Sequence, residues 1–179
     1  MVVLSDQPIP PDRVNTMPTG LPDAVAIRPM APGEEHALSR VYQDSVLGLG
    51  PAHYSPEQVA AWASFGDERE AFTDFVCVPW TVVAEDESGL IGFAGFEDDG
   101  HVPSLYVRHD RARRGVGSQL LEAVLREAES RGMDRLYAEA SLFSKAVFER
   151  HGFVCERMEH SERRGVLFDR FLMARNLSD

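Results

Sequence analysis

The sequence predicts an α/β protein built on a mixed, mostly antiparallel central sheet flanked by helices. Apolar residues recur at helical spacing in some segments and alternate at strand spacing in others, and the two kinds of segment follow one another along the chain. The middle of the chain also holds three strand-like segments joined by turns too short for a helical crossover, so those strands are antiparallel. The expected order of elements is β-α-α-β-β-β-α-β-α-β-β.

Length and composition fit one domain of ordinary size. Of the 179 residues, 44% are hydrophobic and 26% are charged, a balance typical of a globular protein. Residues 1–23 carry five prolines with little apolar periodicity, which predicts an extended, largely disordered tail. The folded domain is therefore expected over residues 24–177.

Charge and cysteine content exclude several classes of protein. The net charge of −11 argues against a nucleic-acid binder, because neutralising phosphates requires a broad basic face. No apolar run approaches the roughly 18 residues of a membrane span, and the N-terminus lacks the basic flank of a signal peptide. Cys77 and Cys155 have neither CxxC spacing nor a partner histidine, so we expect two buried thiols and no metal. The prediction is a cytoplasmic protein.

The first elements have clear start signals. Residues 24–29 read as a short strand, and residues 33–47 repeat apolar side chains at helical spacing. A second helix begins after Ser55, where serine, a first-turn proline and a glutamine three positions after the serine form a capping box. Residues 66–79 are ambiguous and are expected to hold one or two helical turns at most.

From residue 80 onward the apolar period becomes that of strands. Segments 80–84 and 90–96 are joined by an acidic turn, and a second acidic turn at 97–100 leads to a strand at 101–107. Pro103 has no N–H to donate to a neighbouring strand, so it predicts an irregular start to this third strand.

Helices and strands then alternate to the end of the chain. An amphipathic helix ends at Gly132, a strand is expected at 135–140, and a shorter helix at 142–150. Two strands, at 152–156 and 166–173, finish the domain around a polar turn.

The loop that leads into the amphipathic helix has the residues of a phosphate cradle. Gly115 and Gly117 lie at the helix N-terminus, where unpaired N–H groups and the macrodipole favour an anion, and Arg113 and Arg114 adjoin them. A dinucleotide-binding turn would need a third glycine where Leu120 stands, and a Walker loop would need Gly-Lys-Ser/Thr. The alternative is a solvated basic turn that caps an ordinary helix.

This loop resembles the acetyl-CoA loop of the GNAT acetyltransferase superfamily, written Gln/Arg-x-x-Gly-x-Gly/Ala. Gly115 and Gly117 match its glycines, whereas Ala112 stands where Gln or Arg is expected. Residues 148–153 match the superfamily's Tyr-Glu-Lys/Arg-x-Gly-Phe run, except that Phe148 replaces the tyrosine. The order of elements extends the resemblance over most of the chain.

Two further segments, 52–58 and 164–166, resemble a subgroup of small bacterial members whose acceptors are mostly unknown. The resemblance implies an N-acetyltransferase that moves an acetyl group from acetyl-CoA to a primary amine, on a small molecule or a protein, by direct attack in a ternary complex. The loop would hold the pyrophosphate, and the backbone of the preceding strand would hold pantetheine and the thioester oxygen. The residues expected to bind the cofactor are Leu105, Tyr106, Val107, Arg113, Arg114, Gly115, Val116, Gly117, Ser118 and Phe148.

His101 is the predicted general base. In members with a carboxylate base, that base lies four residues before the first cofactor-facing position of the strand, and Leu105 as that first position makes His101 the match. Imidazole, with a pKa of about 6.5, is competent as a base at neutral pH. The alternatives are a half-exposed, idle histidine and water relays from the acids at 97–99.

The general acid and the acceptor wall are predicted with less support from the motif. Phe148 replaces the tyrosine that often protonates the leaving thiolate, and Ser141 and Ser144 are the substitutes, with helix capping as their competing role. Tyr54 and Trp62 are expected to border the acceptor site, Tyr54 more directly, because Trp62 shares a helix face with apolar residues.

A degenerate GNAT domain that binds acyl-CoA as a sensor, without catalysis, is the alternative function, favoured by Ala112 and Phe148. No nucleic-acid or membrane partner is expected. A homodimer is possible through an apolar edge of the last strands, at Val166, Leu167, Phe168 and Phe171.

Overall fold

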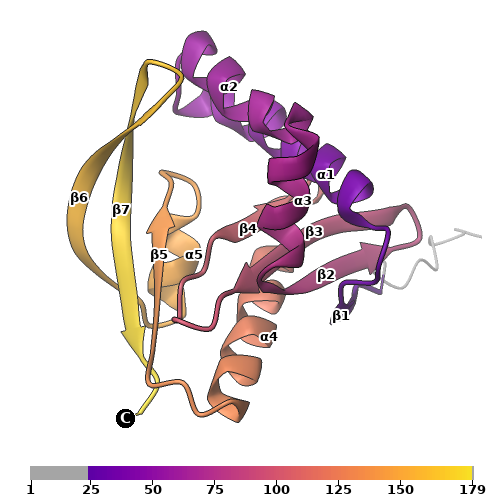
Figure 1. The fold of residues 1–179 in the computed structure, drawn as a ribbon, viewed down its shortest axis with the longest axis vertical. Coiled ribbons are helices and arrows are strands. Elements are labelled where there is room, and N and C mark those ends of the chain that lie inside the picture. The colour runs from indigo at the N-terminus through magenta and orange to yellow at the C-terminus, as the bar shows by residue number, and fades with distance from the viewer. Residues whose placement is uncertain (1–23, 179) are drawn as a thin grey trace, which may run out of the picture.

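The computed structural model describes residues 24–178 as two antiparallel sheets joined by one short parallel contact (Figure 1). The N-terminal sheet has the strand order β1-β2-β3-β4, and the C-terminal sheet has the order β5-β7-β6. The strands are β1 (Ala26–Pro29), β2 (Trp80–Asp86), β3 (Gly89–Phe96), β4 (Ser104–Val107), β5 (Arg135–Ala140), β6 (Val154–Arg163) and β7 (Val166–Asn176). The predicted tail, residues 1–23, lies outside the described residues.

Helices lie on both faces of the N-terminal sheet (Figure 1). They are α1 (Glu35–Leu49), α2 (Pro56–Ala63), α3 (Arg69–Cys77), α4 (Val116–Ser130) and α5 (Lys145–Arg150), with 3-10 turns η1 (Gly50–Ala52), η2 (Ser64–Asp67) and η3 (His109–Arg111). On β2, Val82 packs into the core that contains α4, whereas the next residue, Val83, packs into the core that contains α1, α2 and α3. Successive strand side chains point to opposite faces, so the alternation of apolar residues buries both sides of this sheet.

A glycine on β3 allows α4 to approach the sheet closely. A Cβ at Gly92 would lie 2.9 Å from the Tyr106 carbonyl oxygen and 3.0 Å from Leu120 Cδ1, closer than a side chain tolerates. The same packing brings Gly117, in the first turn of α4, near Val107 at the end of β4, since a Cβ there would lie 3.8 Å from Val107 Cγ2. The start of α4 is thus held against the end of β4.

The two sheets touch only just before β4 and then separate. His101 forms an isolated parallel bridge with Tyr137 on β5, and the Val102 N–H donates to the Tyr137 carbonyl at 2.8 Å. Pro103 has no N–H to continue the ladder, and from Ser104 onward β4 pairs with β3 alone among the described strands. The irregular start predicted at Pro103 is confirmed, and it opens a gap between β4 and β5.

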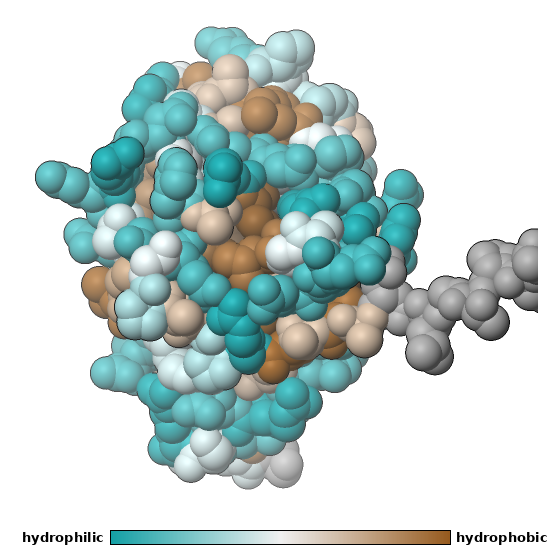
Figure 2. Space-filling view, turned by 90° about the vertical axis from the view of Figure 1, so that its right-hand side faces the viewer, coloured by the Kyte–Doolittle hydropathy of each residue, from teal (hydrophilic) through white to brown (hydrophobic). Residues whose placement is uncertain are grey.

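The side of the molecule on the right of Figure 1 is largely hydrophilic, with a band of hydrophobic residues through its middle (Figure 2). Within residues 24–178, no helix has both the length and the apolar character needed to cross a bilayer.

The predicted fold class and order of elements are confirmed, with corrections of detail. The ambiguous stretch contains a full helix, α3, and β6 continues to Arg163 through part of the expected turn, because polar side chains suit the open face of an antiparallel hairpin. β7 is flanked on both sides only from Phe171 onward, because β5 pairs with Phe171–Asn176, and residues 166–170 pair with β6 alone among the described strands. The homodimer expected through this apolar edge stays a prediction. The expectation of two buried cysteines is wrong, since Cys77 is exposed and Cys155 is half-buried.

Candidate active site

A cavity of about 580 Å³ lies where β4 and β5 separate. Its walls come from the end of α1, from α2, β4, the loop before α4, the end of β5 and the segment that leads into α5. We call one part the phosphate end, lined by Arg113, Gly115, Gly117, Ser118 and Arg150. We call the other part the acceptor end, lined by His53, Trp62, Tyr106, Glu139 and Phe143.

The phosphate end is formed mainly by the backbone at the start of α4. Gly115 is the N-cap, with φ +85°, a left-handed conformation that side chains other than glycine rarely adopt, and no side chain caps the helix there. The first N–H groups of α4 therefore remain free to bind an anion. Nothing within 4 Å would meet a Cβ at Gly115, so its role is conformational.

Two of the arginines before α4 are paired with carboxylates. Arg108 pairs with Asp110 at 2.7 Å, and Arg111 pairs at 2.7 Å with Asp86, whose side chain is 1% exposed. Burial alone would raise the pKa of Asp86, but hydrogen bonds from Ser88 and Arg111 lower it to about 2. These two arginines therefore fasten the base of the loop to the β2–β3 turn.

Three arginines remain unpaired around the phosphate end. Arg113 and Arg114 are exposed and make no ion pair or hydrogen bond with the described residues, and only Arg113 lines the cavity. Arg150, at the end of α5, is also exposed, unpaired within the described chain and part of the lining. Arg150 was not predicted from the sequence, although it occupies the Lys/Arg position of the 148–153 match.

The expected pantetheine-binding strand lines the cavity with all three of its assigned residues, Leu105, Tyr106 and Val107. β4 hydrogen-bonds to β3 through one edge, with Leu105 opposite Ala94 and Val107 opposite Gly92. Its other edge faces the gap toward β5, so backbone groups there can pair with a ligand instead of a strand. Val116, assigned with the loop, instead points into the core and is 2% exposed.

His101 reaches the cavity only through another residue. Its ring does not line the cavity, but its Nε2 lies 2.7 Å from Oε2 of Glu139, which does. Its Nδ1 lies 3.2 Å from Oε2 of Glu97, at the surface. The hydrogen bond to Glu139 raises the pKa of His101 against the opposing effect of burial, and the bond from His101 lowers the pKa of Glu139. The His101 ring thus lies between the carboxyl group of Glu139 on the cavity side and that of Glu97 on the surface side.

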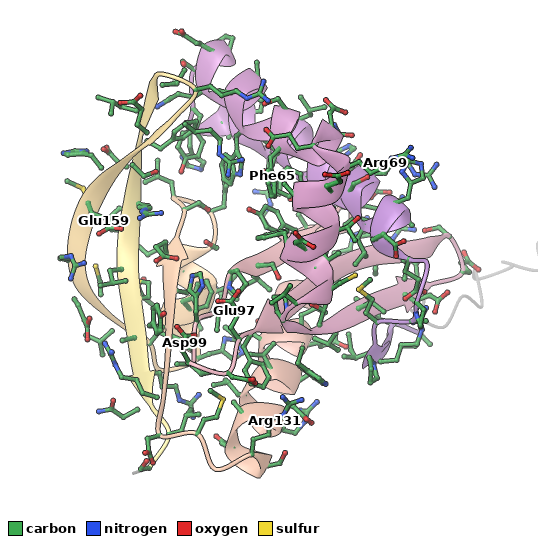
Figure 3. The ribbon with its side chains drawn as sticks, in the orientation of Figure 1. Phe65, Arg69, Glu97, Asp99, Arg131 and Glu159 are labelled. Carbon is green, nitrogen blue, oxygen red and sulfur yellow. The ribbon has the colours of Figure 1, made fainter. Side chains whose placement is uncertain are left out.

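A second set of contacts fixes the orientation of this histidine. The His101 N–H donates to Asp99 Oδ1 at 2.9 Å, and the Tyr137 hydroxyl donates to Asp99 Oδ2 at 2.8 Å. The His101 and Tyr137 rings stack with centroids 5.1 Å apart. In the view of Figure 3, Glu97 and Asp99 appear near each other on the segment that leads into β4, well apart from Glu159 on β6. Sequence reasoning missed Glu139, whose only signal is an acid within the apolar strand β5.

Ser141 and Ser144 line the cavity and bond to each other. The Ser141 N–H donates to Ser144 Oγ at 3.0 Å, the Ser144 N–H donates to Ser141 Oγ at 3.2 Å, and the two hydroxyls are 3.1 Å apart. Phe148 also lines the cavity, although it is 3% exposed and packs on Phe153. The hydroxyls thus shape the turn before α5 and face the cavity at the same time.

Of the two residues expected to border the acceptor site, Trp62 contacts the cavity and Tyr54 does not, the reverse of the expected ranking. Trp62 lines the cavity, whereas Tyr54 is 8% exposed and lies behind it, with the two rings edge to face at 5.4 Å. The Tyr54 hydroxyl accepts a hydrogen bond from the Leu142 N–H at 3.1 Å, so this tyrosine holds the segment that carries Phe143. Phe143 was not assigned from the sequence.

Comparison with known proteins gives consistent matches. Residues 51–174 match the family described as the acetyltransferase (GNAT) domain. The chain is 30% identical over 149 residues to the uncharacterized N-acetyltransferase YafP of Escherichia coli (strain K12), covering 83% of this chain and 94% of that protein.

Two solved structures show the same fold. A GCN5-related N-acetyltransferase (aminotransferase, class-II) from Rhodopseudomonas palustris matches with a TM-score of 0.81 and 26% identity, over 88% of this chain and 99% of that one. The PaiA N-acetyltransferase from Thermoplasma acidophilum, solved in complex with coenzyme A, matches with a TM-score of 0.70 and 17% identity, over 86% and 99% of the two chains.

Proposed function

The chain belongs to the GNAT acetyltransferase family, and from that premise we propose that it transfers an acetyl group from acetyl-CoA to a primary amine by direct attack in a ternary complex. One observation carries the proposal: a single cavity joins an uncapped helix N-terminus with unpaired arginines to the carboxylate of Glu139. The first feature suits a pyrophosphate, and the second suits an amine that must lose a proton.

The phosphate end would hold the cofactor's anionic groups. The N–H groups of the first turn of α4 would bind the pyrophosphate, and Arg113, Arg114 and Arg150 would add charge-assisted hydrogen bonds. The free edge of β4 would pair with the pantetheine amides and offer a backbone N–H to the thioester oxygen near Val107. The PaiA N-acetyltransferase, which has the same fold, was solved in complex with coenzyme A, which supports coenzyme A as the kind of ligand.

Glu139 and His101 together would act as the base. An alkyl ammonium has a pKa of about 10, so it must lose a proton before its nitrogen can attack. Glu139 faces the cavity and would take that proton, while His101 stabilises the carboxylate and connects it to Glu97 at the surface. The sum of the reaction is ammonium plus thioester giving amide, thiol and one proton released to water.

No tyrosine hydroxyl is available at residue 148 to protonate the leaving thiolate, because that residue is Phe148. The hydroxyls of Ser141 and Ser144 line the cavity and would supply or relay the proton that the thiolate takes up. A coenzyme A thiolate is also stable enough to leave without an acid, so we expect this step to tolerate the loss of either serine.

Acetyl-CoA titration followed by a thiol-release assay with a panel of primary amines tests the proposed function. We expect acetyl-CoA to raise the melting temperature and amines to release thiol. Stabilisation without thiol release would support the sensor, which Ala112 and Phe148 favour, over the enzyme. The absence of stabilisation at millimolar acetyl-CoA would contradict both functions.

We propose that a homodimer through the last strands would use the outer edge of β6, because Gln58 of α2 already bonds to Leu167 on the part of β7 that extends beyond β5. The outer edge of β6 pairs with no other described strand, and Val154 and Met158 on it are 68% and 54% exposed. Light scattering of the chain and of Met158→Arg would test this arrangement, with a dimer in the first and a monomer in the second as the expected result. A monomeric unmodified chain would contradict it.

A further inference from the structure

We infer that the acceptor is a small primary amine with a flat apolar body and no carboxylate, an inference that rests on the proposed acetyl transfer. The acceptor end of the cavity has an aromatic wall and is closed on the side of α2. It contains the carboxylate of Glu139 but, among the described residues, no arginine that could pair with a carboxylate of the acceptor. Each of these three properties excludes a different class of amine.

Aromatic rings form the wall of the acceptor end. Trp62 and Phe143 lie nearly parallel, with an angle of 23° and centroids 6.3 Å apart, and the Tyr106 ring lies 6.5 Å from Trp62. Leu49 and Ala52 add apolar surface to the same lining. Such a wall binds a flat hydrocarbon by burial and edge or face contacts, and it offers a polar body few hydrogen bonds.

The β6–β7 hairpin closes the acceptor end on the side of α2. The tip of this hairpin reaches α2 in Figure 1. The Gln58 side-chain amide donates to the Leu167 carbonyl at 2.8 Å, and Arg164 pairs with Glu68 at 2.8 Å. Phe168 packs against Trp62 with centroids 6.2 Å apart. A polypeptide acceptor would need an open groove between α2 and the hairpin, and these contacts fill it.

The segment before α5 closes the neighbouring side. The Leu142 N–H donates to the hydroxyl of Tyr54, and the ring of Phe143 packs on His53 with centroids 5.0 Å apart. Both elements that border the acceptor end are thus packed against the α1–α2 region, which leaves a pocket for a small molecule.

The charges around the acceptor end favour an amine without a carboxylate over an amino acid. Glu139 lines the acceptor end with Glu97 and Asp99 behind it, so an ammonium group is favoured there. The arginines of the lining, Arg113 and Arg150, belong to the phosphate end, and Arg170 on β7 is held by Glu159 at 2.6 Å. A carboxylate beside the reacting amine would meet no free guanidinium and would face Glu139.

Arg163 is a half-buried cation next to Phe65. Its guanidinium lies 4.7 Å from the centroid of the Phe65 ring, and its Nη1 is buried with no hydrogen-bond partner in the described chain. It is not part of the cavity lining. An acceptor carboxylate in the cavity would therefore not contact Arg163 directly.

Three matched amines test the inference with the full chain and saturating acetyl-CoA. Phenethylamine is the flat apolar amine, phenylalanine adds a carboxylate, and a short peptide with one lysine represents protein acceptors. We expect kcat/KM for phenethylamine to exceed that of each of the other two by at least about tenfold. A higher value for phenylalanine or for the peptide would overturn the inference. Acetylation of none of the three or of any panel amine would overturn the proposed function itself.

Two variants assign the effect to the aromatic wall. Trp62→Ala and Phe143→Ala should raise KM for phenethylamine at least about fivefold and leave KM for methylamine, which has no apolar body, within twofold. Phe143→Leu, which keeps apolar volume, should restore part of the affinity. An equal change for the two amines would overturn a role in recognising the amine's body, because a loss of folding or of acetyl-CoA binding affects both alike.

Discussion

The two ends of the cavity are built in different ways. The phosphate end consists of backbone N–H groups and a left-handed glycine from one short segment before α4, with exposed arginines around it. The acceptor end consists of side chains from α2, β4, β5 and the segment before α5, held by contacts between residues far apart in the sequence. A backbone site tolerates changes of side chain and is easily harmed at its glycine, whereas a side-chain site responds to each residue. We propose that the same division separates cofactor binding from chemistry.

The largest effect is expected from removing the carboxylate at the acceptor end. Glu139→Gln should lower kcat by roughly 10² to 10⁴, as expected for a lost general base, and should leave acetyl-CoA affinity unchanged. Steady-state kinetics by thiol release measures both. Glu159→Gln is the control, because its side chain is 24% exposed against 25% for Glu139 but does not line the cavity. Equal losses in the two variants would contradict the role of Glu139.

A β-branched residue at the helix N-cap should harm the phosphate end next most. Gly115→Val forces a branched side chain into a left-handed conformation, so the N–H groups of α4 should shift and weaken acetyl-CoA binding at least about tenfold. Gly132→Val is the control, because Gly132 also has a positive φ, +69°, with open space around it, but lies beyond the other end of α4. Similar affinities of the two variants would show that strain alone, and not the cradle, sets binding.

Smaller effects are expected from the arginines of the phosphate end. Arg113→Ala, Arg114→Ala and Arg150→Ala should each weaken acetyl-CoA binding a few-fold, and less at high salt, because exposed charges are screened. Titrations at 0.05 M and 0.5 M salt measure this dependence. Arg126→Ala removes an exposed arginine of α4 outside the cavity and should change nothing. Losses that do not depend on salt would argue for a structural role of these arginines.

The smallest effect concerns stability as a function of pH. The pKa of His101 is raised in the folded chain, so its bond to Glu139 stabilises fully below the unfolded pKa of about 6.5 and is lost as pH rises through the folded value. The lowered pKa of Glu139 adds stability above its ordinary value of 4.5, which is lost as pH falls through the folded value. The melting temperature of the chain should therefore exceed that of His101→Gln by a few degrees near pH 6 and by less at alkaline pH. A constant difference would contradict the ion pair.

The sequence predicted the position of the helix N-terminus at the phosphate end because its signal is local. Gly115 and Gly117 and the amphipathic helix after them are contiguous, and their conformation follows from helix-terminus geometry alone. The pairing of Arg111 with Asp86 could not be predicted from the sequence, because Asp86 becomes its neighbour only when the end of β2 is placed beside the loop.

The acceptor end was predicted only in part because it depends on how the strands diverge. His101 was predicted by counting residues along one strand. In the structure, β4 begins only at Ser104, after Pro103, and His101 forms a bridge with β5 instead. Glu139 therefore lies between His101 and the cavity. How far β5 covers the apolar edge of β7 likewise depends on strand pairing, since β5 pairs with Phe171–Asn176 and leaves residues 166–170 paired with β6 alone among the described strands.

Calorimetric titration of the unmodified chain, Gly115→Val and Glu139→Gln with acetyl-CoA tests the division between the two ends most directly. The account predicts that the unmodified chain and Glu139→Gln bind acetyl-CoA with equal affinity, and that Gly115→Val binds it at least about tenfold more weakly. Weaker binding by Glu139→Gln together with full affinity in Gly115→Val would contradict the placement of the cofactor at the N-terminus of α4.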